Sequence, residues 1–131
     1  MIHKMKINDN AFLRMNNGSK EREYRINDDK RRKVKIGDII EFHRISNPED
    51  IIEMKVYDIK TYKTIKDAIK EYFDKDFSSR HKDIDIDSTV QSFYDKGFVT
   101  QEEEEKYGMV VFHIKKIKQK TTRQIEKNIL E

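Results

Sequence analysis

The longest uninterrupted apolar run in this chain of 131 residues is Met109–Phe112. A membrane-spanning helix needs about 20 apolar residues, so no segment of the sequence is long enough to cross a bilayer. Charged residues make up 40% of the chain and hydrophobic residues 35%. A core must therefore be assembled from several short amphipathic segments, which predicts one compact domain with a thin core.

The first residues lack the apolar stretch of a secretory signal peptide, and the chain contains no Cys. Disulfides, thiolate metal sites and a thiol nucleophile are therefore excluded. Together these features predict a cytoplasmic protein.

Charge is distributed unevenly along the chain, although the net charge is only +3. Residues 1–35 carry a net charge of +6, residues 36–114 carry −7, and residues 115–131 carry +4. Basic segments at both ends of an acidic middle are compatible with an anionic partner at one place on the protein.

Apolar periodicity predicts both strands and helices. Strands are expected at residues 3–7, 20–26, 39–45, 51–62 and 109–117, with the third and fourth forming an antiparallel hairpin around a loop at residues 46–50. Helices are expected after Asn8 or Asp9, after Thr64, around residues 87–94 and, as a short turn, after Thr100, with a polar connection over residues 74–87. Because strands and helices do not alternate regularly, the pattern favours an α+β fold built on a small barrel or curled sheet.

Known catalytic and metal-binding patterns are missing. The four His residues show no metal-ligand spacing, and the four Gly residues form no phosphate-binding loop. We therefore expect no metal and no cofactor.

One segment combines charge with tight turning, namely Gly18 to Arg25. Glu23 and Arg25, two residues apart on a predicted strand, project to the same face as a hydrogen-bond acceptor and a donor fork. Lys20 stands at the entrance of this strand. From charge alone, the simpler interpretation is a surface strand on which Glu23 and Arg25 neutralise each other.

The pattern Gly18-x-Lys20-x-x-Glu23-x-Arg25 resembles the GxKxxExR signature of the ASCH domain family, a branch of the PUA-like superfamily. Three further markers follow in the order seen in that family. They are Gly37-Asp38 before a strand with Ile40 and Phe42, the Tyr62–Phe73 region leading into a helix, and Glu105-Lys106-Tyr107-Gly108 before the last strand. The resemblance covers about residues 3–117.

The resemblance implies a small PUA-like β-barrel of about five to six strands with two or three flanking helices. On this basis residues 1–117 form an ASCH/PUA-like domain, and residues 118–131 form a basic C-terminal tail that either frays or adds a peripheral helix. The family implies binding of RNA or a nucleotide in a cleft lined by Lys20, Glu23 and Arg25. Tyr62 or Tyr94 would supply a stacking surface for a base.

An enzymatic alternative stays open. The amidohydrolase branch of the family, which removes the acetyl group of N4-acetylcytidine, carries a Thr where this chain has Glu23. Glu23 could instead act as a general base for water, with Lys20 stabilising the oxyanion, in such a hydrolase or in an RNA-processing hydrolase. A structural or regulatory domain with a vestigial cleft is the third hypothesis. The sequence leaves the ligand and the oligomeric state open.

Overall fold

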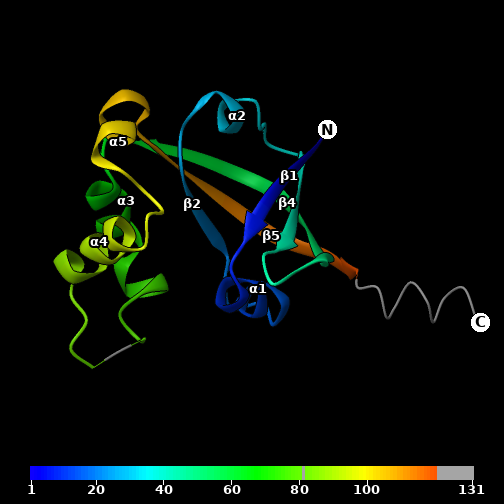
Figure 1. Cartoon of the computed structure of the whole chain (residues 1–131), viewed down its shortest axis with the longest axis horizontal. Helices are drawn as coiled ribbons and strands as arrows, with labels where there is room; N and C mark the ends of the chain where they lie inside the picture. Colours follow the sequence, from blue (N-terminus) through cyan, green and yellow to red (C-terminus); the bar gives the residue numbers. More distant parts are fainter. Residues whose placement is uncertain (81, 121–131) are drawn as a thin grey trace, which may run out of the picture. The chain divides into compact units, whose positions relative to one another are not determined.

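The computed structural model describes residues 1–80 and 82–120. The elements in chain order are β1 (Ile2–Ile7), α1 (Asp9–Asn16), β2 (Arg22–Ile26), α2 (Asp29–Arg32), β3 (Ile39–Arg44), β4 (Asn47–Tyr62), α3 (Ile65–Asp76), α4 (Ile86–Asp95), α5 (Gln101–Tyr107) and β5 (Met109–Lys120) (Figure 1). The strands form a five-stranded sheet in the order β1-β3-β4-β5-β2. The predicted α+β fold is confirmed, with five helices in the described residues in place of the two or three expected.

Contacts within the chain divide it into two compact units. Unit 1 contains residues 1–21, residues 35–58 and the described residues from His113 onward. Unit 2 contains residues 22–34 and 59–112. The long strands β4 and β5 each contribute residues to both units.

Unit 1 is built on a parallel pair and a hairpin. β1 pairs in parallel with β3, and β3 pairs antiparallel with β4. Helix α1 begins at Asn8, whose side chain accepts a hydrogen bond of 2.8 Å from the backbone N–H of Ala11. Alternate strand positions and one face of α1 supply a buried core consisting of Met5, Ile7, Ala11, Phe12, Met15, Ile40, Phe42, Ile52, Met54, Val56 and Ile114.

The prediction of a loop over residues 46–50 is wrong. Strand β4 begins at Asn47, directly after a short turn, because Arg44 of β3 pairs with Asn47. Asn47, Pro48 and Glu49 are exposed, so this end of the hairpin extends beyond the core. Cross-strand pairing here outweighs the local turn preference of Asn and Pro.

Strand β5 also extends further than predicted, through Lys120 rather than residue 117. The ammonium group of Lys120 lies 2.9 Å from the carboxylate of Glu53, which is buried on β4 in the same unit. The first three residues of the expected tail therefore continue the strand. Residues 121–131, where a peripheral helix was considered, lie outside the described part of the chain.

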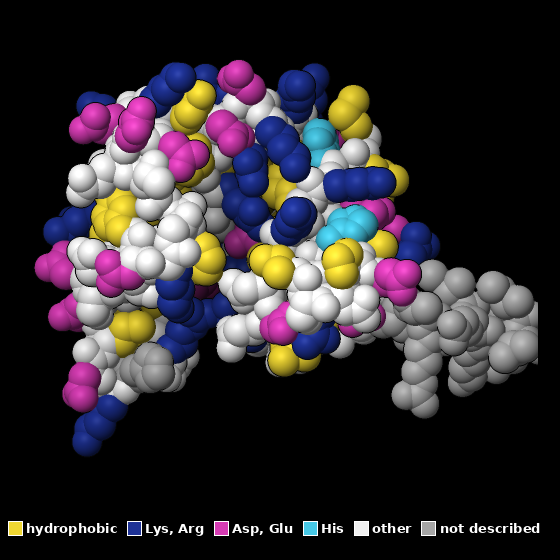
Figure 2. Space-filling model, viewed as in Figure 1, with side chains coloured by type: hydrophobic (Ala, Val, Ile, Leu, Met, Phe, Trp, Pro, Cys, Tyr) yellow, Lys and Arg dark blue, Asp and Glu magenta, His cyan; other side chains and the backbone are white. Residues whose placement is uncertain are grey.

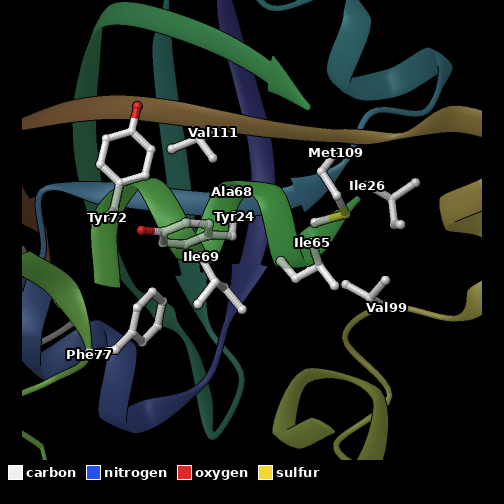
Figure 3. Packing of buried hydrophobic residues seen from close by; sticks show 10 residues of the cluster. All are labelled: Tyr24, Ile26, Ile65, Ala68, Ile69, Tyr72, Phe77, Val99, Met109 and Val111. Atoms are coloured by element: carbon white, nitrogen blue, oxygen red, sulfur yellow. The ribbon is translucent and has the colours of Figure 1, made fainter. Parts of the chain in front are cut away.

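Unit 2 encloses a second core between α3 and the strands. The side chains are Tyr24, Ile26, Ile65, Ala68, Ile69, Tyr72, Phe77, Val99, Met109 and Val111 (Figure 3). As predicted, Thr64 caps α3, accepting a hydrogen bond of 3.1 Å from the backbone N–H of Asp67. Helix α4 packs against α3, and α5 begins at the predicted cap Thr100.

No helix formed by residues 1–80 and 82–120 has both the length and the apolar character needed to cross a membrane.

Candidate functional site

Glu23 and Arg25 of β2 form an ion pair. Nη2 of Arg25 lies 3.2 Å from Oε2 of Glu23, and Oε1 of Glu23 accepts a hydrogen bond of 3.2 Å from the backbone N–H of Tyr24. The Glu23 side chain is 7% exposed and the Arg25 side chain 20% exposed. The buried carboxylate therefore orients a guanidinium group that solvent can reach. Of the predicted site residues, the structure brings these two into contact.

The opposite face of β2 carries a second ion pair, which sequence reasoning missed. Nε and Nη2 of Arg22 each donate a hydrogen bond of 2.7 Å to the carboxylate of Asp76 at the end of α3. The hydroxyl group of Tyr24 bonds to the same carboxylate, and the guanidinium of Arg22 lies 5.1 Å from the centre of the Tyr72 ring. A planar two-bond contact of this kind fixes β2 against α3, and it thereby sets the position of the Glu23–Arg25 pair.

Burial, followed by the hydrogen bond to Asp76, raises the pKa of Tyr24 far above its ordinary value. In the unfolded chain this phenol ionises near pH 10, whereas in the folded protein it stays neutral. The resulting contribution to stability is complete below about pH 10 and is lost as the pH rises further. We expect the free energy of unfolding, measured with urea between about pH 8 and pH 11, to fall less steeply above pH 10 in Tyr24→Phe than in the wild type. Equal slopes would contradict this assignment.

Lys20 lies in unit 1, whereas Glu23 and Arg25 lie in unit 2. Its backbone N–H donates a hydrogen bond of 3.0 Å to the carbonyl of Arg14, and its side chain is half-buried. Gly18 precedes it with a φ of 83°, a left-handed conformation that glycine adopts without strain. The turn expected from this glycine is therefore present.

Tyr62 and Tyr94, the predicted stacking residues, are half-buried in unit 2. The hydroxyl of Tyr62 bonds to Glu71 and, at 3.0 Å, to the hydroxyl of Tyr72. The hydroxyl of Tyr94 lies 2.8 and 2.9 Å from the carboxylate oxygens of Glu104. Burial, and then this contact with Glu104, raises the pKa of Tyr94 to about 12. Both hydroxyl groups are thus hydrogen-bonded to residues of helices. Tyr62 also lines a groove in unit 2.

An open groove of about 370 Å³ lies in unit 2, lined by Asn27, residues 61–63 and residues 104–108. Gly108 at its wall has a φ of 71°, and a Cβ atom there would come within 2.8 Å of the carbonyl oxygen of Tyr62. Only glycine permits this approach. The sequence marked Glu105–Gly108 as a family motif, but it did not show that these residues meet Asn27 and Lys63.

Among residues 1–80 and 82–120, no group of three or more His, Asp or Glu side chains is arranged to hold a metal ion.

No known protein-family model matches the sequence, and no curated protein sequence matches it either. Solved structures do match. The hypothetical protein PH0355 is 27% identical with a TM-score of 0.74, over 89% of this chain and all of that one. Protein PF0455 from Pyrococcus furiosus is 24% identical with a TM-score of 0.67, over 90% of this chain and 99% of that one.

The ASCH protein from Zymomonas mobilis is 13% identical with a TM-score of 0.59, over 96% of this chain and 77% of that one. A mutant of that protein is similar with a TM-score of 0.61 at 10% identity, over 99% of this chain and 80% of that one. At these identities the likeness shows the fold. The chain therefore has the fold of ASCH domain proteins, as its resemblance to their sequence signature predicted.

Proposed function

We propose that this chain is an RNA- or nucleotide-binding module of the ASCH fold, and that Arg25 makes a central contact. The observation that carries the proposal is the Glu23–Arg25 pair. It lies within the family signature and presents a fixed guanidinium group beside a buried carboxylate. A planar donor fork held in this way suits a phosphate or a base carbonyl.

Glu23 is proposed to act through Arg25, because its side chain is almost fully buried whereas that of Arg25 is partly exposed. Lys20 enters the proposal only through the sequence resemblance. The fold supports the general class of function, since RNA or nucleotide binding is what the ASCH resemblance implies.

Binding of a fluorescently labelled single-stranded RNA, measured by anisotropy, tests the proposal. We expect affinity to fall steeply between about 50 and 200 mM salt, because cations on the protein displace the counterions of the phosphates. Arg25→Ala should weaken binding by about 10- to 100-fold, the loss expected when a hydrogen bond to a charged group is removed. Arg25→Lys keeps the charge but lacks the planar donor fork, so its affinity should lie between that of the wild type and that of Arg25→Ala.

Arg80→Ala is the matched control, since Arg80 is exposed in the same unit and lies over Phe77. Its affinity should stay close to that of the wild type. Circular dichroism verifies that each variant is folded. No binding of RNA or free nucleotides by the wild type, or binding that Arg25→Ala leaves unchanged, would overturn the proposal.

The hydrolase hypothesis predicts a different readout. Chromatography after incubation with N4-acetylcytidine would show turnover by the wild type and none by Lys20→Ala or Glu23→Gln. Turnover that follows this pattern would replace the binding module with an enzyme, whereas binding without turnover supports the proposal as stated.

A further inference from the structure

Two cations lie over the ring of Tyr107, at the end of α5. Nζ of Lys106 is 5.1 Å from the ring centre, and the guanidinium carbon of Arg32 is 6.0 Å from it. Arg32 also donates hydrogen bonds to the main-chain oxygens of Asn27, at 2.6 Å, and of Tyr107, at 3.2 Å. The segment after β2 and the end of α5 are thus joined at one wall of the groove in unit 2.

Among the described residues, these cations have no carboxylate partner. Within residues 1–80 and 82–120, neither Arg32 nor Lys106 forms an ion pair, and the same holds for Lys63, which lines the groove. All three side chains are exposed. Glu104, which also lines the groove, is engaged by the Tyr94 hydroxyl and, at 2.8 Å, by the backbone N–H of Ile65. A bound anion would offset the positive charge of these side chains.

The groove offers more than positive charge. Its volume of about 370 Å³ lies at the lower end of the range for small-ligand pockets, about 300–1,000 Å³. Tyr62, Tyr107 and Glu105 are also among the residues that line it. Lys and Arg side chains lie close to Asp and Glu side chains on the surface around α2 and α5 (Figure 2). Such a mixture suits one nucleotide, with cations for the phosphate and aromatic and acceptor groups for the base.

We infer that this groove binds one nucleotide of a single-stranded RNA, with its phosphate at Arg32, Lys63 and Lys106. This inference rests on the proposed function and extends it from the Glu23–Arg25 pair to a second contact surface in the same unit. The phosphate that we infer at this groove belongs to an RNA chain. A free nucleotide has the same chemistry, and the experiment separates the two.

The test compares salt dependence in two double variants. Lys63→Gln/Lys106→Gln should bind labelled single-stranded RNA at least about tenfold more weakly at low salt. Its plot of log affinity against log salt should be shallower by about 0.7, the contribution of one phosphate contact on a single strand. The matched control is Lys70→Gln/Lys75→Gln, which removes two exposed lysines of α3 and should leave the slope unchanged. Arg32 is left intact because its bonds to main-chain oxygens contribute to local structure.

The possible failures are distinct. If the groove variant keeps the wild-type slope while Arg25→Ala weakens binding, the groove is not used and the proposed function stands. If the wild type binds no RNA, the proposed function fails as well. Competition with uridine monophosphate identifies the source of the phosphate. If uridine monophosphate displaces the labelled RNA at concentrations comparable to that of the RNA, the inference of an RNA chain as the ligand is overturned.

Discussion

Replacing Asp76 by Ala is expected to lower the free energy of unfolding by about 3–5 kcal/mol, the usual cost of removing one partner of a buried ion pair. The Arg22 side chain is 8% exposed. Without Asp76, the guanidinium group of Arg22 would stay buried but would lose both of its hydrogen bonds to that carboxylate. The hydroxyl of Tyr24 would lose the same partner. Urea unfolding of the variant and the wild type measures the difference.

Asp87→Ala is the matched control, because Asp87 pairs with Lys66 on the surface of the same unit. The side chain of Asp87 is 81% exposed, so this pair should contribute about 0–1 kcal/mol. If Asp76→Ala unfolds at the same urea concentration as Asp87→Ala, the Arg22–Asp76 pair does not anchor β2 as described.

Gly108→Ala is expected to cost roughly 3–5 kcal/mol, the sum of a strained backbone and an overpacked contact. The φ of 71° and ψ of −167° at Gly108 belong to a region that residues with a side chain rarely adopt. The new methyl group would also lie 2.8 Å from the Tyr62 carbonyl, which is main chain and cannot rotate away. Thermal or urea unfolding gives the loss directly.

Gly97→Ala separates the two causes. Gly97 also has a positive φ, of 74°, but a Cβ atom there would meet nothing within 4 Å. Its substitution should therefore cost only the backbone term, about 1–2 kcal/mol. Equal losses at the two positions would show that the approach of Gly108 to Tyr62 adds nothing.

Local features of the fold were predictable because each depends on neighbouring residues. The cap at Thr64, and the face of β4 that carries Ile52, Met54 and Val56, follow from helical and strand periodicity. The loop over residues 46–50 was predicted wrongly, because the pairing of β3 with β4 decides where the hairpin turns, and that pairing is not visible in local residue preferences.

The same distinction applies to the candidate site. The contact between Glu23 and Arg25 follows from their spacing along one strand. The bond between Arg22 and Asp76 joins residues 54 positions apart, and the sequence pattern predicts a polar connection at Asp76. The groove likewise combines three distant segments, of which Tyr62 and the Glu105–Gly108 part carry a sequence signal and Asn27 does not.

A nuclear magnetic resonance titration of the ¹⁵N-labelled chain with a short single-stranded RNA tests the central claim most directly. The account predicts amide shift changes that saturate as RNA is added. They should be largest at residues 23–26 of β2 and at Asn27, which follows the strand, with further changes at Lys63 and at Lys106–Gly108. Addition of salt should reverse these changes. An unchanged spectrum, or changes confined to residues outside these segments, would contradict the proposal that this protein binds RNA through Arg25.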